Sequence, residues 1–425
     1  MKILFITYYW PPSGKASLHW PLDIISNLYN LNCEPIILTT KDESFTEKDE
    51  SLLNKINPEW KVIKAKTIEP FNIYRRFIGK KPGDKLIASE TISLENKSFT
   101  HRISIWIRMN LFIPDARIGW YFNAIKESNK FLAKENVDAI ISVGPPHTTH
   151  LIAKKLSKKF CIPLFPVFID PWVDIIYYKN LKRSFITKKI DNQLEKSVIK
   201  SANKIIFVTE TMKEDYIKKY PFIKDKSFVL YWGYNEEDFK SLPLNTFLKE
   251  EDFEKDKVIV HAGNIFDYQN PEMLWKEIRN KLNQGKKFKI KFIGTVSPLI
   301  KQSIKNYNLE TFTEYIGFLP YRKMLEELSN ADYLLVCASE KRHLPGKLFE
   351  YIRIGKPIIA FGNDNAEVKQ ILDETKSGWL FSYNEELKGL FDIPFDKKFN
   401  IDLVKKFDRK NIAKRLKEIL TGNDN

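Results

Sequence analysis

The segment that decides the fold is LPGKLFEYIRIGKPIIAF, residues Leu344–Phe361. Its Pro345–Gly346 pair predicts the start of a helix, and Gly355 predicts the end, because glycine readily adopts the left-handed conformation that closes a helix. Pro357 then begins an uninterrupted apolar run, which is typical of a strand buried on both faces of a parallel sheet. The segment is therefore predicted to be one helix and one strand of an α/β domain.

The first turn of this predicted helix combines a cation with an acid. Lys347 lies beside the backbone amides of Gly346 and Leu348, and such a helix start attracts phosphate. Glu350, one turn later, can accept two hydrogen bonds from a ribose diol. A capped core helix is the simpler interpretation, but packing alone requires neither charge. We therefore interpret this turn as a candidate phosphate- and ribose-binding site.

Apolar runs alternate with helical patterns along almost the whole chain. The predicted strands of the first half are Ile3–Tyr9, Pro35–Thr39, Asp138–Val143, Leu164–Ile169, Lys204–Val208 and Phe228–Tyr231. Those of the second half are Val258–His261, Lys289–Ile293, Asp332–Cys337, Pro357–Phe361 and Trp379–Ser382. Helices are predicted at Tyr321–Ser329, Lys347–Arg353 and Arg409–Leu420, and from the four-residue spacing of Ile152, Leu156 and Phe160 and of Ile186, Ile190, Leu194 and Val198. This alternation indicates α/β domains with doubly wound parallel sheets.

The length of 425 residues indicates two domains, since a single core rarely grows beyond about 250–300 residues. We assign an N-terminal domain to residues 1–240, a C-terminal domain to 241–400, and a helix that returns to the N-terminal domain to 401–425. A polar, acid-rich stretch after Lys240 marks the boundary. In two such domains the cleft between the carboxyl ends of the sheets is the default ligand site.

The chain holds 69 Lys+Arg and 54 Asp+Glu, a formal net charge of +15. Residues 61–134 contribute 15 basic against 6 acidic residues, interleaved with aromatic ones, and we interpret them as a basic aromatic insert. Its segment His101–Phe112 places three apolar residues on one helical face, Ile103, Ile107 and Leu111, a pattern typical of a helix on an anionic membrane. A solvated face over core aromatics is the alternative. Nucleic-acid binding is not expected, because no recognisable module is present.

Three N-terminal segments follow predicted strands and carry candidate site residues. In PPSGK, Gly14 permits a tight turn that brings backbone amides and Lys15 close to a phosphate. In SVGPPHTTH, His147 and His150 lie at a helix start, where an imidazole can donate a hydrogen bond or a proton. In FIDPWVD, Asp170 at the carboxyl end of a strand can bind hydroxyl groups of a polar ligand. Ordinary turn and capping roles remain open for each.

The sequence excludes several classes of protein. No run of eighteen uncharged apolar residues is present, and the first residues are predicted to form a strand rather than a secretory signal. The three cysteines are far apart and fit neither a disulfide framework nor a zinc pattern. The histidine pair has no acidic ligand beside it, so we expect neither a metal site nor a cofactor. We expect a cytoplasmic protein that is peripheral on the inner face of the cytoplasmic membrane.

Segments in a fixed order along nearly the whole chain resemble glycosyltransferases of the GT-B fold, close to glycosyltransferase family 4. They are the PPSG loop, PDARIGW (Pro114–Trp120), SVGPPHTTHLIA, FIDPWVD, VTETMKEDY (Val208–Tyr216), LYWGYNEEDF (Leu230–Phe239), HAGNIF (His261–Phe266), GFLPY (Gly317–Tyr321), ADYLLV (Ala331–Val336) and PGKLFEYIRIGKPII. The resemblance implies two Rossmann-like, doubly wound α/β domains facing across a cleft. It also implies metal-independent, retaining transfer of a sugar from a nucleotide-sugar donor to a glycan or lipid-linked acceptor, in the synthesis of a bacterial surface polysaccharide or glycoconjugate.

The same resemblance implies roles for individual residues. The N-terminal domain would bind the acceptor and the C-terminal domain the donor. Gly14 would approach the donor diphosphate, and so would Gly263 and Asn264. Glu350 matches the family glutamate that binds the ribose. The base would be held by the backbone of Gly317, Phe318 and Leu319.

Departures from the family pattern leave other functions open. Lys15 stands where a second glycine is frequent, and Arg342 where an acidic residue is frequent. The segment NIFDYQNP lacks the cationic pair that usually neutralises the diphosphate. Lys347, Lys15 and Arg342 are then the candidates to stabilise the departing diphosphate. A GT-B scaffold without catalysis and a sugar-nucleotide 2-epimerase are the alternatives.

Overall fold

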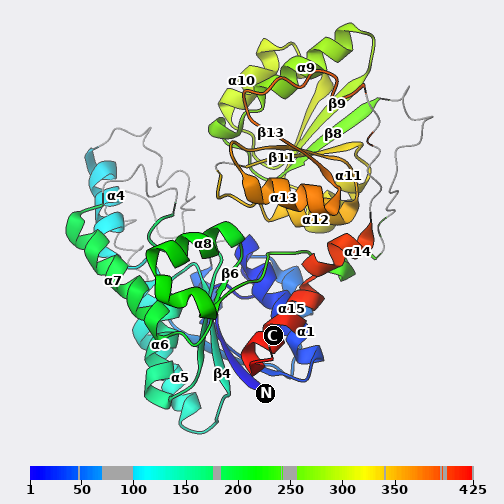
Figure 1. Cartoon of the computed structure of the whole chain (residues 1–425). Coiled ribbons are helices and arrows are strands. Elements are labelled where there is room, and N and C mark those ends of the chain that lie inside the picture. The colour runs from blue at the N-terminus through cyan, green and yellow to red at the C-terminus, as the bar shows by residue number, and fades with distance from the viewer. Residues whose placement is uncertain are drawn as a thin grey trace. The chain divides into compact units, whose positions relative to one another are not determined.

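The computed structural model describes residues 1–45, 48–68, 99–175, 183–240, 242, 256–338, 341–392, 395 and 400–423 (Figure 1). The chain divides into two compact units, Met1–Tyr231 with Ala413–Asn425, and Trp232–Ile412. Helix α15 (Arg409–Thr421) passes from the second unit into the first. Most of the predicted linker after Lys240 lies outside the described residues.

The first unit contains a seven-stranded parallel sheet in the order β3-β2-β1-β4-β5-β6-β7. The order reverses between β1 and β4, which is the topological switch point of a Rossmann-like fold. The strands are β1 Lys2–Ile6, β2 Glu34–Thr40, β3 Lys61–Ala65, β4 Ala139–Gly144, β5 Leu164–Phe168, β6 Ile205–Phe207 and β7 Ser227–Val229. The helices are α1 His19–Asn30, α4 Phe99–Leu111, α5 Tyr121–Leu132, α6 Thr148–Phe160, α7 Phe185–Ser201 and α8 Glu210–Lys219.

The second unit contains a six-stranded parallel sheet in the order β10-β9-β8-β11-β12-β13, with its switch point between β8 and β11. The strands are β8 Lys257–Ala262, β9 Phe288–Ile293, β10 Thr313–Gly317, β11 Tyr333–Cys337, β12 Ile358–Phe361 and β13 Gly378–Phe381. The helices are α9 Glu272–Asn283, α10 Pro298–Asn306, α11 Tyr321–Ser329, α12 Lys347–Ile354, α13 Ala366–Thr375 and α14 Ile401–Val404. Figure 1 shows α9 and α10 on one side of this sheet and α11, α12 and α13 on the other.

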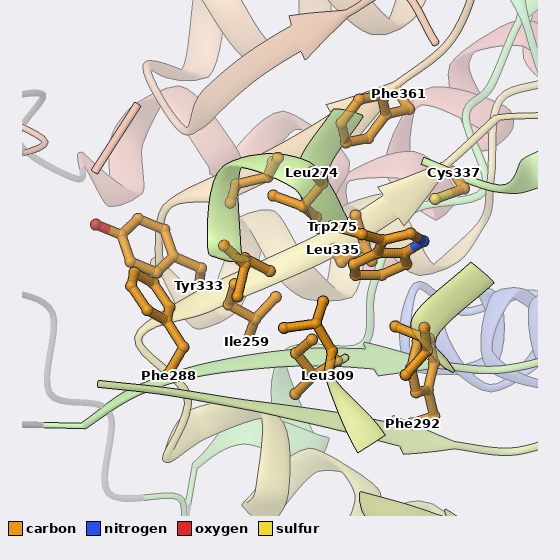
Figure 2. Packing of buried hydrophobic residues seen from close by; sticks show 14 of the residues in the cluster. Ile259, Leu274, Trp275, Phe288, Phe292, Leu309, Tyr333, Leu335, Cys337 and Phe361 are labelled. Atoms are coloured by element: carbon orange, nitrogen blue, oxygen red, sulfur yellow. The ribbon is translucent and has the colours of Figure 1, made fainter. Parts of the chain in front are cut away.

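The core of the second unit explains why its strands read as continuous apolar runs. Ile259 of β8 and Leu335 of β11 are fully buried and pack with Leu274 and Trp275 of α9 (Figure 2). Since helices cover both faces of the sheet, the inner strands β11 and β12 are buried along their whole length. The expected fold class, two Rossmann-like doubly wound α/β domains, is confirmed. No helix within the described ranges is long and apolar enough to cross a membrane.

The predicted insert over residues 61–134 is wrong at both ends. Lys61–Ala65 forms β3, which pairs with β2, and α5 contributes Ala124 and Leu132 to the core of the first unit. Both ends of the range therefore belong to the domain itself. Its central part, with the basic segment 71–81, lies outside the described residues. The sequence pattern also does not predict β10, an edge strand of the second sheet.

Helix α7 forms where predicted, but its apolar spacing does not mark its buried face. Ile186 and Ile190 are exposed, whereas Asp191 and Glu195 are fully buried. The reason is a polar network beneath the FIDPWVD loop. Asp191 accepts hydrogen bonds from the Trp172 indole (2.7 Å) and the Arg183 guanidinium (2.6 Å). Partners for buried acids decide how the helix is rotated, because an unpaired buried charge is costly.

Glu195 completes this network from the next turn of α7. Its carboxylate accepts hydrogen bonds from the hydroxyls of Tyr216 (2.9 Å) and Tyr220 (2.7 Å), and it pairs with Lys219 at 2.7 Å. The backbone amide of Val173 also donates to it. Two buried acids of one helix thus hold the loop that follows β5.

Helix α4 also differs from its predicted arrangement. Its buried residues include Ile105 and Met109, while Trp106 and Leu111 are exposed and Ile107 is half-buried. The side chain of Ile103, the third member of the predicted face, lies outside the described part of the helix. Of the residues predicted to face a membrane, Leu111 is exposed and Ile107 is only half-exposed, so the structure agrees with that prediction in part.

The buried network makes a stability prediction. Asp191→Ala leaves the Arg183 charge buried without its partner, so we expect a loss of about 3–5 kcal/mol in the free energy of unfolding. Lys188→Ala, an exposed position on the same helix, is the control and should change it by less than about 0.5 kcal/mol. Urea unfolding followed by tryptophan fluorescence measures both. Equal midpoints for the two variants would contradict the role assigned to Asp191.

Candidate active site

The switch point of the second sheet holds a lysine amine against a histidine. The Lys347 Nζ lies 3.2 Å from His261 Nε2, and His261 Nδ1 lies 2.9 Å from the Leu335 carbonyl oxygen. The carbonyl can only accept, so Nδ1 carries the proton and Nε2 accepts from the amine. Burial lowers the pKa of His261 well below its usual range, and the Lys347 charge lowers it further. The imidazole is therefore neutral and orients the lysine.

The Lys347 amine is placed where its positive charge can bind an anion. Burial lowers its pKa to about 8, since the charged form has lost much of its hydration. A Cβ on Gly263 would lie 2.8 Å from Nζ, and the backbone φ of Gly263 is +102°. Only glycine suits that conformation and leaves room for the amine. Lys347 and Gly263, two predicted site residues 84 positions apart, are thus in one place.

Three glycine turns lie next to one another, and the first of them, at Gly263, lies beside this amine. Gly263 and Gly294 follow β8 and β9, Gly317 is the last residue of β10, and all three have positive φ. The amide of Gly294 donates to the Gly317 carbonyl at 2.7 Å, and a Cβ on Gly294 would lie 2.7 Å from the Gly263 oxygen. Asn264 accepts from the Thr295 amide at 3.3 Å, which ties the first turn to the second. The result is a surface made of backbone at the carboxyl edge of the sheet, where a ligand can approach closely.

The predicted ribose residue Glu350 is held by a tyrosine that sequence reasoning did not single out. The Tyr321 hydroxyl donates to Glu350 Oε1 at 2.8 Å. Burial raises the pKa of Glu350, while the tyrosine hydroxyl and the Arg409 guanidinium act in the opposite direction. Tyr321 closes the GFLPY segment, so one short stretch supplies both the predicted base-binding turn and the support for Glu350. Phe318 of that turn is 89% exposed and offers an uncovered ring.

The remaining residues of the second unit that were predicted to bind the donor have different surroundings. Gly346 packs against Trp232, whose ring would lie 3.0 Å from an added Cβ, and the Arg409 guanidinium lies 5.7 Å from the centroid of that ring. The side chain of Leu348 is buried in the core, so only its backbone can serve a ligand. Arg342 is exposed on the loop between β11 and α12.

In the first unit, Gly14 and Lys15 follow β1. Gly14 is exposed and Lys15 is half-buried, and the chain then enters a short 3-10 helix and α1. The Lys15 amide lies 3.4 Å from the Ser13 hydroxyl, whose residue closes a turn on Trp10. The predicted strand, loop and helix order around Gly14 is therefore confirmed.

His147 and His150 lie below the surface, at the start of α6. His150 Nδ1 lies 2.8 Å from the Ser142 hydroxyl, and the His147 ring stacks on Trp172 with centroids 4.9 Å apart. Burial lowers the pKa of His147 to about 3 and that of His150 well below its usual range. Both are neutral at pH 7. The proton-donating imidazolium, one role left open by the sequence, does not agree with this burial.

The two imidazoles point at one position above Gly144. A Cβ on Gly144 would lie 2.5 Å from His150 Nε2 and 3.0 Å from His147 Nδ1. In the described part of the chain neither nitrogen has a hydrogen-bond partner. Asp170 lies after the neighbouring strand β5, and burial raises its pKa to about 6. The sequence-predicted trio therefore comes from two adjacent strand ends in one unit.

Asp115 of the PDARIGW segment is a supporting residue that local spacing does not reveal. Its carboxylate accepts from the Thr148 amide and the Thr148 hydroxyl, both at 2.9 Å. These bonds cap the first turn of α6 from a residue 33 positions earlier. Asp115 thereby fixes the helix that carries His150.

Comparisons with known proteins agree with this geometry. Residues 89–238 match the Glycosyltransferase Family 4 model, and residues 245–392 match Glycosyl transferases group 1. The chain belongs to the GT-B glycosyltransferases of family 4 and group 1, and the predicted resemblance is confirmed. The protein named "Probable glycosyltransferase WbjE" of Pseudomonas aeruginosa is 25% identical over 240 residues, which cover 55% of this chain and 58% of that protein. The chain thus spans little more than half of that relative.

Two solved structures share the fold over the full length. Anabaena Alr3699/HepE in complex with UDP is 13% identical with a TM-score of 0.63, covering 99% of this chain and 100% of the other. The apo form of the lipopolysaccharide outer core galactosyltransferase WaaB is 15% identical with a TM-score of 0.58, covering 100% of both. At this identity the likeness establishes the architecture only.

Proposed function

We propose that this protein transfers a sugar from a nucleotide-sugar donor to a glycan or lipid-linked acceptor in the synthesis of a bacterial surface polysaccharide or glycoconjugate. The observation that carries the proposal is the Lys347 amine, held at the switch point of the second sheet between neutral His261 and the Gly263 turn. Ligands of doubly wound sheets bind at that point. The HepE structure with UDP and the lipopolysaccharide assignment of WaaB support this donor class and this pathway class.

In the proposed reaction, the second unit holds the donor. Glu350, supported by Tyr321, accepts hydrogen bonds from the ribose hydroxyls. The base lies on the Gly317–Leu319 turn, where the exposed Phe318 ring supplies an apolar surface. Lys347 faces the diphosphate and lies beside the Gly263 turn. Lys15 and Arg342 are further candidate cations for the diphosphate.

The chemical step breaks the bond between the anomeric carbon and the diphosphate oxygen, and a new bond forms to the acceptor hydroxyl oxygen. The negative charge that develops on the leaving diphosphate is neutralised by Lys347, so the proposed step uses no metal ion. The acceptor hydroxyl loses its proton, and the candidate groups of the first unit are His147, His150 and Asp170. Retention of configuration belongs to the proposal through the family resemblance.

A lipid-linked acceptor would bring the enzyme to the inner face of the cytoplasmic membrane, and the surplus of basic residues suits an anionic surface. Because NIFDYQNP lacks a cationic pair, a scaffold without catalysis is the competing function. Release of a nucleoside diphosphate from any of a panel of UDP-, GDP- and ADP-sugars would support the enzyme. Binding of those donors without release would favour the scaffold.

Removing the amine should slow the reaction strongly. Lys347→Ala loses a charge-assisted contact to the leaving diphosphate, so we expect a barrier higher by roughly 2–4 kcal/mol, or a rate about 30- to 1000-fold lower. Lys323→Ala, an exposed position on α11, is the matched control and should turn over normally. The rate of nucleoside diphosphate release per enzyme molecule measures the activity of both variants. A Lys347→Ala rate within threefold of wild type would overturn the assignment.

The lowered pKa of Lys347 predicts a pH dependence. Below pH 8 the amine is charged and attracts the diphosphate; above pH 8 it is neutral. The affinity for UDP should therefore fall about tenfold between pH 7 and pH 9, following the protonated fraction of one group. Isothermal titration at both pH values checks this. In Lys347→Met the affinity should be lower and nearly independent of pH over this range, and an equally steep fall in that variant would assign the effect to another group.

A further inference from the structure

The outer face of α7 is basic and apolar without an exposed acid. Phe185 is 78% exposed, Ile186 69% and Ile190 40%. Exposed lysines accompany them along the helix, namely Lys188, Lys189, Lys196 and Lys200. The two acidic residues of the helix, Asp191 and Glu195, are fully buried. Large apolar side chains are normally found on the buried face of a helix, so this distribution calls for a partner.

Internal constraints fix this face outward. Asp191 and Glu195 are bonded to Trp172, Arg183 and Tyr216 under the loop after β5. Turning α7 to bury its isoleucines would expose that network and break it. The exposed apolar side chains are therefore a fixed feature of the folded unit. None of the described residues covers them.

Helix α4 adds exposed apolar side chains beside it. Its last turn contacts the start of α7, because Ser184 donates its amide to Asn110 Oδ1 at 2.6 Å and Thr187 donates its hydroxyl to the Asn110 carbonyl at 3.2 Å. Leu111, next to that contact, is 62% exposed, and Trp106 is 50% exposed. Figure 1 shows α4 and α7 side by side. We call the exposed residues of the two helices the α4–α7 face, comprising Trp106, Leu111, Phe185, Ile186, Lys188, Lys189 and Ile190.

We propose that the α4–α7 face binds the surface of an anionic phospholipid bilayer, with its apolar side chains in the interface and its lysines on the headgroups. The charge pattern selects this occupant. Aromatic and aliphatic side chains among lysines, with every acid of α7 turned inward, match a surface that is apolar below and uniformly negative above. The inference deepens the membrane part of the proposed function, and its test does not require sugar transfer.

The test is co-sedimentation of the full chain with vesicles of phosphatidylcholine alone or with 30% phosphatidylglycerol. We expect at least tenfold tighter binding to the anionic vesicles, weakened by raising the salt concentration. Two variants address the face: the triple change Phe185→Ser, Ile186→Ser, Ile190→Ser, and the double change Lys188→Glu, Lys189→Glu. Each should weaken binding at least tenfold. The matched controls, Phe222→Ser and Lys224→Glu, alter exposed positions elsewhere in the same unit and should bind as wild type.

Circular dichroism and UDP affinity report whether each variant is folded and whether the second unit is intact, which separates this proposal from the donor site. Equal binding to neutral and anionic vesicles would overturn the proposal, and so would wild-type binding by both face variants. A concentration-dependent dimer that the triple variant abolishes, without vesicle binding, would assign the face to a second copy of the chain instead.

Discussion

The contact between the Lys347 amine and the neutral His261 imidazole is the constraint on which the second unit depends. A buried amine needs an acceptor, and His261 can accept only because its other nitrogen donates to β11 across the switch point. The Gly263 turn must stay free of a side chain to admit the amine. Strand order, glycine turn and helix start are thus linked through one hydrogen-bonded charge.

In the first unit, two buried acids hold the structure around the candidate site. Asp191 and Glu195 are buried so that they can hold the loop after β5, and that loop places Trp172 against His147. The same choice turns the isoleucines of α7 outward. A polar network that positions a candidate site thereby creates an apolar surface on the other side of the helix.

The sequence predicts most strands because a doubly wound sheet buries its central strands on both faces and so requires continuous apolar runs. It does not predict β3 or β10, since these edge strands carry charged, exposed residues such as Lys61, Lys64 and Glu314. The spacing of Ile186 and Ile190 correctly predicts a helix, but it does not show which face of that helix is buried. The spacing shows only that apolar residues recur with the period of a helix. Which face of α7 is buried depends on its two acids, whose hydrogen-bond partners come from other segments.

The candidate site follows the same division. Lys347, Glu350 and Gly263 can be proposed from local motifs, and the structure brings Lys347 and Gly263 together. His261, Tyr321 and Asp115 cannot, because each acts through a hydrogen bond to a residue between 29 and 86 positions away. Their only signal is membership of segments that resemble the family, HAGNIF, GFLPY and PDARIGW.

The most direct measurement of the central claim is hydrogen–deuterium exchange of the whole chain with and without UDP, GDP and ADP. At least one nucleotide should slow exchange in the turns at Gly263–Asn264 and Gly317–Leu319 and in the first turn of α12. The first and third of these segments lie at Lys347, and the Gly317 turn is joined to the Gly263 turn through Gly294. Exchange unchanged in all three segments with every nucleotide, or protection confined to other parts of the chain, would contradict the account.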